Sequence, residues 1–291
     1  MSNYSIRDLE HLSGIKAHTL RIWEQRYNII QPKRTDTNIR TYDDQDLKLV
    51  LNISLLKDHG HKISEISKLS LEEMGHAVMA IADQKLSYPD QIHALTLSMI
   101  DLEEERFEKI ISTNFLHNGF ENTMTHIIYP FLNRIGTLWV TGSIGPAQEH
   151  FISNLIRQKV IVAIDGQVVK YRPDSKKFIL YLPEGELHEL GLLFASYIIR
   201  SRHHKVIYLG QTLPFGELVF ACDVHKPDYI FSAITSLPSN GDVQPYVDKL
   251  SRQFPDTEIL LTGYQIVGQD IQPGHNCRII NKIDDLIGML D

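Results

Sequence analysis

The sequence predicts a multidomain protein of α plus α/β class, with a small helical head, a four-helix bundle and a doubly wound parallel sheet. Up to about residue 166, apolar residues recur at spacings of three and four, which is typical of amphipathic helices. From Lys176 onward, short apolar runs alternate with helical patterns, which is typical of β-α repeats. A length of 291 residues and a hydrophobic content of 43% suffice for two or three folded domains. We expect these domains at residues 1–72, 74–166 and 176–291.

Charge is distributed unevenly along the chain. The formal net charge of −7 would by itself argue against binding to nucleic acid. Residues 1–70, however, hold 11 Lys and Arg against 9 Asp and Glu, and residues 16–41 hold six basic residues against two acidic ones. A compact basic region on an acidic protein is typical of a small DNA-reading head on a body that does not bind DNA.

The sequence carries no sign of a membrane or secreted protein. No apolar stretch is long enough to span a bilayer, and the first residues lack the charged-then-apolar pattern of a signal peptide. Cys222 and Cys277 lie far apart and match no zinc or redox spacing. We therefore expect a cytoplasmic protein with reduced cysteines and no membrane partner.

The first 58 residues predict three helices. Ser5 can cap a helix that runs to about Leu12, and Asp43 can cap another over residues 44–58. Between them, residues 16–27 predict a second helix, joined to the first by a short turn, and such a pair suits docking in the major groove. Its buried positions would be Leu20, Trp23 and Tyr27, and its outward positions His18, Arg21 and Gln25.

The segment from Gln31 to Tyr42 is basic and predicts a wing that grips phosphates. Together with the helices it predicts a winged helix-turn-helix head. The pattern alone leaves an alternative open, a generic three-helix bundle whose arginines are merely solvated, because short helix-turn-helix patterns are common.

The head also resembles a known family. The run at residues 19–27 (Thr-Leu-Arg-Ile-Trp-Glu-Gln-Arg-Tyr), with Pro32-Lys33-Arg34, Arg40-Thr41-Tyr42 and Asp46-Leu47, is similar to the MerR family head almost position for position. This resemblance covers about the first 70 residues and implies dimeric binding to near-palindromic double-stranded operator DNA. It assigns DNA contacts to Arg21 on the second helix and to Arg34, Arg40 and Tyr42 on the wing. His18, Arg26 and Lys33 complete the predicted DNA-binding set.

Residues 74–166 predict a four-helix bundle. Short breaks at 87–89, 118–119 and 142–146 divide this zone into about four helices. Within it, Glu149 and His150 follow Trp139 by ten and eleven residues. Taken alone, this spacing is equally well explained by a core Trp and a Glu-His pair in the first turn of a helix, where Glu favours the helix dipole.

The last zone predicts a flavodoxin-like (Rossmann-like) sheet. Ligands of such sheets bind at the carboxyl ends of the strands. Helices are expected from about His188, Phe215 and Val243, and a last short helix follows the fifth strand. The expected strands lie at residues 178–181, 206–209, 229–231, 259–261 and 278–280.

Residues 186–191, Glu-Leu-His-Glu-Leu-Gly, follow the first expected strand, where a ligand should bind. His188 can offer a neutral imidazole to a metal, and the carboxylate of Glu186 can orient the ring through its other nitrogen. Gly191 would let the start of a helix lie close to a large flat ligand. The alternative is a solvated surface histidine flanked by glutamates, the usual case for this spacing alone.

The same segment resembles the Asp-x-His-x-x-Gly motif of cobalamin-binding domains, whose His is the lower cobalt ligand. In that resemblance, Ser232 falls where the family has Ser-x-Leu, and Gly263 where it has Gly-Gly. The spacing of Trp139 from Glu149-His150 is similar to the signature of CarH-like light-sensing adenosylcobalamin regulators. There the Trp and the Glu-His pair cover the upper, adenosyl face of the cofactor. The Trp-Glu-x-Arg-Tyr variant in the head resembles the same subgroup.

Three positions depart from these patterns. Glu186 stands where the motif has Asp, and Tyr264 where it has the second Gly. Val140 follows Trp139, where some of these photoreceptors have a His that captures cobalt after photolysis. The last departure argues against capture of cobalt by two histidines.

The resemblances imply a transcription regulator, not an enzyme, that binds adenosylcobalamin and responds to light by changing its oligomeric state and operator affinity. A homodimer is the smallest assembly that the head implies. An alternative, favoured by Glu186 and Tyr264, is a degenerate cobalamin fold that senses another small molecule or a protein partner. A corrinoid methyl carrier is disfavoured, because a DNA-binding head has no place in a methyl shuttle. Repression and activation both stay open. Relatives that activate twist an overlong promoter spacer, which would make RNA polymerase a further partner.

Overall fold

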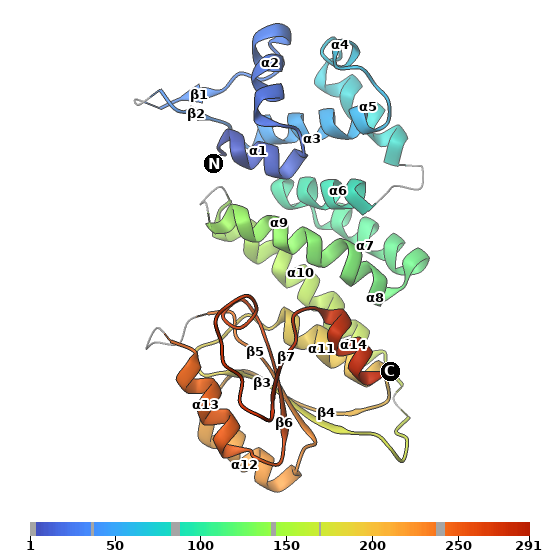
Figure 1. Cartoon of the computed structure of the whole chain (residues 1–291). Helices are drawn as coiled ribbons and strands as arrows, with labels where there is room; N and C mark the ends of the chain where they lie inside the picture. Colours follow the sequence, from blue (N-terminus) through green and yellow to red (C-terminus); the bar gives the residue numbers. More distant parts are fainter. Residues whose placement is uncertain (1–3, 36–37, 83–87, 141–143, 169, 237–241) are drawn as a thin grey trace. The chain divides into compact units, whose positions relative to one another are not determined.

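The computed structural model divides the chain into two compact units, residues 1–155 and 156–291, hereafter the first and second unit. Helix α10 (Pro146–Asp165) contains the boundary between them (Figure 1). The side chains of residues 79–82 and 137–140 lie outside the description. The structure describes residues 4–35, 38–82, 88–140, 144–168, 170–236 and 242–291.

The head of the first unit has the predicted helices and wing. Helix α1 (Ile6–Ser13) begins with a capping box at Ser5 and ends at Gly14, whose φ of 75° allows the left-handed turn into α2. Helix α2 spans Ala17–Tyr27, and Asp43 caps α3 (Asp44–Asp58). The wing between them is the antiparallel pair β1 (Lys33–Arg34) and β2 (Arg40–Thr41).

The remainder of the first unit is helical. Helices α4 (Ile63–Ile66) and α5 (Leu71–Ala82) follow the head. The bundle helices are α6 (Tyr88–Asp101), α7 (Glu104–Asn118), a continuous run of α8 (Phe120–Thr123), a π-helical turn (Met124–Ile128) and α9 (Tyr129–Val140), and then α10.

The predicted division of the bundle was wrong at one point, because α6 and α7 are separate helices. Leu102 between them has a φ of 54°, in the left-handed region. The Glu103 N–H donates to the Ser98 carbonyl at 2.9 Å, a bond that closes α6 in the manner of a Schellman motif. Such an ending usually carries Gly or Asn, and a Leu at this position gives the sequence no signal for it.

Helices of the head and of the bundle contact each other within the first unit. Lys48 on α3 forms an ion pair with Asp101 at the end of α6. His59 Nε2, just after α3, lies 3.8 Å from Asp90 Oδ2 on α6. His93, one turn after Asp90, is only 4% exposed. Burial and the charge of Arg134 lower the pKa of His93 to about 4, although Asp90 and the Leu12 backbone oppose this shift.

We expect acid to destabilise the first unit through His93. Its pKa in the folded state lies below that of an unfolded histidine, so below about pH 6.5 the unfolded chain binds more protons. The contribution of neutral His93 to the free energy of unfolding is fully present above that pH. It is lost as the pH falls towards 4, by about 3 kcal/mol in all. Urea unfolding at several pH values should show a shallower pH dependence for His93→Gln. The exposed-site control His126→Gln should follow the wild type, and equal slopes for all three proteins would contradict the assignment.

The second unit is a parallel five-stranded sheet in the order β4-β3-β5-β6-β7, which confirms the flavodoxin-like prediction. Figure 1 shows α12 and α13 on one face of the sheet and α11 and α14 on the other. The strands are β3 (Lys177–Pro183), β4 (Lys205–Leu213), β5 (Tyr229–Ala233), β6 (Glu258–Thr262) and β7 (Cys277–Ile279). The helices are α11 (Leu190–Ser201), α12 (Phe215–His225), α13 (Gln244–Gln253) and α14 (Ile283–Leu290).

The interior of this sheet explains the continuous apolar runs of the sequence. Residues 178–182 of β3 are completely buried, because helices cover both faces of the sheet. One face packs on α12 and α13 through Leu218, Val247 and Leu250. The first strand, β3, lies between β4 and β5, so the chain passes from β3 to β4 on one side and then crosses back to β5 on the other. The carboxyl ends of β3 and β5 therefore meet at the topological switch point, where ligands of such sheets bind.

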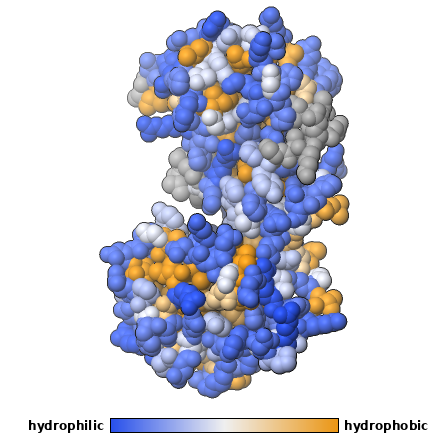
Figure 2. Space-filling model, turned by 45° about the vertical axis from the view of Figure 1, so that its right-hand side comes forward, coloured by the Kyte–Doolittle hydropathy of each residue, from blue (hydrophilic) through white to orange (hydrophobic). Residues whose placement is uncertain are grey.

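The surface of both units is largely hydrophilic on the side that Figure 2 shows, with separate hydrophobic areas on each. In the part of the chain that the structure describes, no helix has the length and apolar character needed to cross a membrane.

Candidate functional site

Helix α2 presents the predicted polar face. Leu20 and Trp23 are 2% and 4% exposed and face the core of the head, whereas Tyr27 is only half-buried. The side chains of the opposite face are exposed: His18, Arg21, Gln25 and Arg26. Arginines and an amide on one exposed helix face can donate hydrogen bonds to base edges and phosphates.

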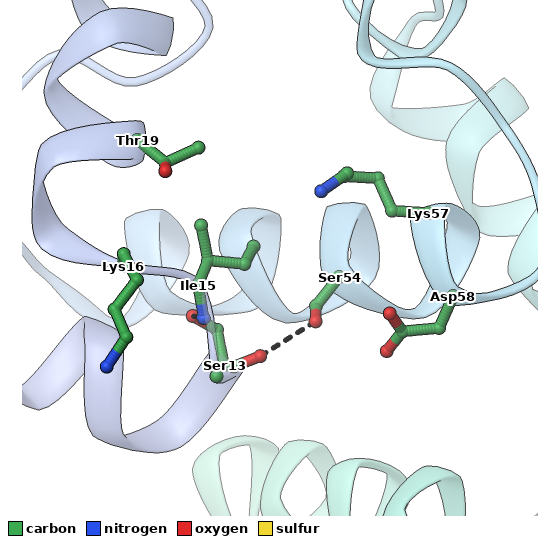
Figure 3. A pocket seen from close by; sticks show the side chains of 8 residues that line it. Ser13, Ile15, Lys16, Thr19, Ser54, Lys57 and Asp58 are labelled. Carbon is green, nitrogen blue, oxygen red and sulfur yellow. Dashed lines mark hydrogen bonds between the residues drawn. The ribbon is translucent and has the colours of Figure 1, made fainter.

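Helix α3 contacts the turn before α2. Ser54 Oγ on α3 donates to the Ser13 carbonyl at 2.8 Å, at the base of a polar pocket of about 290 Å³ (Figure 3). Lys57 Nζ, also from α3, lies 5.1 Å from the centroid of the Trp23 ring. These contacts fix the start and the middle of α2 on α3, which positions its exposed face.

Two of the predicted wing cations are exposed. Lys33 Nζ donates to Asp43 at 3.0 Å, and Arg34 Nη1 donates to Asn38 Oδ1 at 2.7 Å. Both contacts are at the surface, where a phosphate can replace them with little change in energy.

The other two wing residues are less available than the sequence predicted. Arg40 is half-buried and donates to both carboxylate oxygens of Glu24 on α2, with Nε at 3.0 Å from Oε2 and 3.3 Å from Oε1. Tyr42 was expected to face DNA, but its side chain is 2% exposed. Its backbone pairs with Tyr4 through hydrogen bonds of 2.8 and 2.9 Å, which draws the ring into the core of the head.

The Arg40–Glu24 contact predicts a difference between two wing arginines. Arg40→Ala should lower the free energy of unfolding of the first unit by about 1 kcal/mol, because the pair is bidentate and partly buried. Arg34→Ala should leave it within about 0.5 kcal/mol of the wild type, as expected for an exposed position. Urea denaturation of the two variants measures this difference, and equal losses would show that Glu24 does not anchor the wing.

The carboxylate of Glu186 is the centre of the site in the second unit. It follows β3 and is 3% exposed. Its Oε2 accepts the backbone N–H groups of Thr235 and Ser236, after β5, at 2.7 and 2.6 Å. Its Oε1 accepts those of Leu187 and His188 at 3.0 and 2.9 Å. Glu186 therefore joins the two loops that meet at the switch point.

The same carboxylate orients His188. His188 Nδ1 lies 2.6 Å from Glu186 Oε1, while the histidine side chain is 64% exposed. Burial opposes ionisation of Glu186, but the hydrogen bonds from His188 and from the backbone N–H groups outweigh it and lower its pKa to about 2. An ionised carboxylate can only accept, so Nδ1 carries a proton, and in the neutral ring the lone pair is on Nε2. This is the arrangement of a metal-binding histidine.

The other predicted residues of the second unit divide into two groups. A Cβ at Gly191, on the first turn of α11, would meet no atom within 4 Å, so the start of this helix borders open space. Ser232 is completely buried on β5. Gly263 has a φ of 101°, and a Cβ there would lie 2.4 Å from the Ile234 carbonyl oxygen. Ser232 and Gly263 thus lie within the packing of the sheet, and Tyr264 beside them is 72% exposed.

Glu149 lies in the first turn of α10, and His150 directly follows it. His150 Nδ1 is 2.7 Å from Glu149 Oε2, and Ser153 Oγ donates to Glu149 Oε1 at 2.6 Å. His150 has an exposed side chain. Trp139 belongs to the last turn of α9, and its side chain lies outside the described residues.

The fit to a cobalamin is good around His188. An exposed, pre-oriented imidazole and an open helix start beside it are what the lower face of a corrin requires. Sequence reasoning missed Thr235 and Ser236, because both donate backbone N–H groups to Glu186, for which the residue type gives no signal. The Ser236 hydroxyl also lies 3.2 Å from His188 Nδ1. Sequence reasoning also missed the partners of Glu189, Arg157 and Tyr208, which lie 32 and 19 residues away in the sequence.

Comparison with known proteins finds two family models that match parts of this chain. Residues 4–73 match the family model described as MerR HTH family regulatory protein, and residues 91–163 match the model described as B12 binding domain. Together the matches define the class: the chain is a DNA-binding transcription regulator with a MerR-type head and a B12-binding domain.

Within this class the chain is similar over most of its length to two transcriptional repressors. It is 26% identical over 258 residues to the HTH-type transcriptional repressor CarH of Myxococcus xanthus, covering 87% of this chain and 85% of the relative. It is 27% identical over 234 residues to the repressor CarA of the same organism, covering 77% and 74%. The regulator MlrA of Escherichia coli (strain K12) is 33% identical over 73 residues, which is 25% of this chain and 30% of the relative.

Proposed function

We propose that this regulator binds adenosylcobalamin in its second unit, with His188 as the lower cobalt ligand, and that the bound cofactor controls assembly and operator affinity. The observation that carries the proposal is the 2.6 Å contact between His188 Nδ1 and the buried carboxylate of Glu186, on an otherwise exposed ring. When bound, the cofactor supplies a cobalt–carbon bond that light can break.

The protein's own residues have separable tasks in this proposal. Glu186 fixes the tautomer and the direction of the His188 ring, so that Nε2 offers its lone pair. The open space at Gly191 admits the flat ring system next to the start of α11. Trp139, Glu149 and His150 are proposed to cover the upper face. Ser232 and Gly263 are proposed to border the nucleotide tail, from within the sheet.

The head is proposed to bind double-stranded operator DNA as a homodimer or a higher homo-oligomer. His18, Arg21 and Arg26 on α2 and Lys33 and Arg34 on the wing are exposed and available for this contact. Arg40 can join them only by leaving Glu24. RNA polymerase is the further partner if the protein acts by twisting a promoter. We place this activity in the cytoplasm, together with the operator DNA.

The decisive experiment is a visible spectrum of the purified protein, mixed in the dark with adenosylcobalamin, desalted and then illuminated. We expect retained corrin bands that change on illumination, and weaker retention for His188→Ala. His225→Ala is the matched control, because His225 is an exposed residue at the end of α12, near the amino end of β3. Operator binding and size-exclusion elution, in the dark and after illumination, measure the response. Failure of the wild type to retain the cofactor would overturn the proposal.

A second candidate function is regulation by a different small molecule. The observation that favours it is the close packing of Gly263 on Ile234, which accounts for this glycine without a nucleotide tail. Under this alternative, the wild type retains no corrin, yet the head still binds its operator. A methyl carrier is not favoured, since CarH, CarA and MlrA are all transcription regulators by name.

A further inference from the structure

Glu189, the residue after His188, is a buried carboxylate that the motif does not explain. It is 7% exposed, although it lies on the loop between β3 and α11, directly before the first residue of the helix. Burial of a carboxylate costs several kcal/mol unless cationic or hydrogen-bonding partners compensate it. The burial of the Glu189 carboxylate therefore requires that the surrounding groups compensate its charge.

Two side chains from different elements compensate this charge. Arg157 on α10 forms an ion pair with Glu189 Oε1 through its Nε. The hydroxyl of Tyr208, on β4, donates to Glu189 Oε2 at 3.2 Å. Burial and the nearby Glu189 charge raise the pKa of Tyr208, so its hydroxyl keeps its proton at neutral pH. All three residues belong to the second unit.

The loop that holds His188 is therefore anchored on both sides of the histidine. Before it, Glu186 is bound to the loop after β5, and the Leu187 carbonyl accepts Gln211 Nε2 at 2.7 Å. After it, Glu189 is bound to α10 and β4. A rigid peptide between two fixed anchors gives the imidazole one height and one direction relative to the sheet.

We propose that Glu189 is a positioning residue for His188, and that Arg157 and Tyr208 act through it to tie the cobalt-binding loop to helix α10. This inference rests on the proposed function. It adds that cobalt binding at His188 would act on helix α10 through Glu189 and Arg157. A ligand that pulls on the imidazole must also displace Glu189, and with it Arg157.

The test uses Arg157→Gln, Glu189→Gln and the double variant in the full-length protein. Arg252→Gln is the matched control, because Arg252 on α13 is exposed and donates only within its own helix in the described contacts. The first readout needs no cofactor: amide hydrogen exchange of residues 186–191 in the free protein. We expect exchange at least about tenfold faster in each single variant, and no further change in the double variant, since the residues act as one unit.

The second readout is the affinity and the visible spectrum with adenosylcobalamin. We expect affinity to fall about 10- to 100-fold, the usual effect of removing an outer-shell partner of a metal ligand, with a smaller share of the histidine-ligated spectrum. Unchanged loop exchange would overturn the proposal, even if the wild type bound no cobalamin. Faster exchange with unchanged affinity and spectrum would also overturn it, because Glu189 would then be structural only. Failure of the wild type alone to bind would instead contradict the proposed function.

Discussion

Replacement of Gly263 by alanine should lower the free energy of unfolding of the second unit by about 4 kcal/mol. The new Cβ would lie 2.4 Å from the Ile234 carbonyl oxygen and 2.7 Å from its carbonyl carbon and nitrogen. A φ of 101° adds strain of about 1–3 kcal/mol for any L side chain. Neither strand can move away easily, because Ile234 N–H donates to the Thr262 carbonyl at 2.8 Å and Gln265 N–H to the Ile234 carbonyl at 3.0 Å.

Gly268→Ala provides the matched control for this prediction. Gly268 also has a positive φ, of 77°, but a Cβ there would meet no atom within 4 Å. It should therefore lose only about 1 kcal/mol, from backbone strain alone. Urea denaturation of both variants measures the difference. Similar losses would show that the close approach to Ile234 relaxes at no cost.

Replacement of Glu186 by alanine is expected to loosen the switch point and abolish corrin retention. The variant would leave the part-buried backbone N–H groups of Thr235, Ser236 and His188 without their acceptor, the buried Glu186 carboxylate. Unpaired buried donors cost about 1–3 kcal/mol each, so we expect a loss of about 3 kcal/mol or more in the free energy of unfolding. The His188 ring would also lose its orienting carboxylate.

Glu186→Asp separates reach from charge. The aspartate side chain is one methylene shorter. Its carboxylate should accept hydrogen bonds from the backbone N–H groups of the loop after β3 or of the loop after β5, but not from both. We expect an intermediate loss of stability and an affinity for adenosylcobalamin about tenfold lower than that of the wild type. A free energy of unfolding and a corrin affinity equal to those of the wild type would instead show that the two loops close around the shorter side chain.

The sequence was most informative where local pattern and tertiary environment agree. The strands were predictable because β3, β5 and β6 are buried on both faces and therefore consist of consecutive apolar residues. The caps at Ser5 and Asp43 were predictable because their capping boxes are local. The pair Glu186 and His188 was predictable as well, since both residues lie on one short loop.

Other features depend on contacts between distant segments, which no single stretch of sequence encodes. The break at Leu102 comes from a left-handed residue without the usual Gly. The burial of Tyr42 comes from its backbone pairing with Tyr4, and a family motif identifies the residue without its exposure. The partners of Glu189 come from α10 and β4, which only the folded topology brings to the same loop.

The Glu24–Arg40 pair has a consequence for the salt dependence of operator binding. A cation that neutralises a phosphate releases counterions from DNA, and each such contact steepens the fall of affinity with salt by roughly 0.9 in logarithmic slope. Arg40 leaves a carboxylate behind when it turns to a phosphate, and that carboxylate recruits a cation in return. A salt titration would therefore count Arg21, Arg26 and Arg34 but register little from Arg40, and the same holds for Lys33 if it leaves Asp43. Arg40, the wing arginine that is held most firmly in the free protein, would therefore contribute almost nothing to the slope of operator affinity against salt concentration.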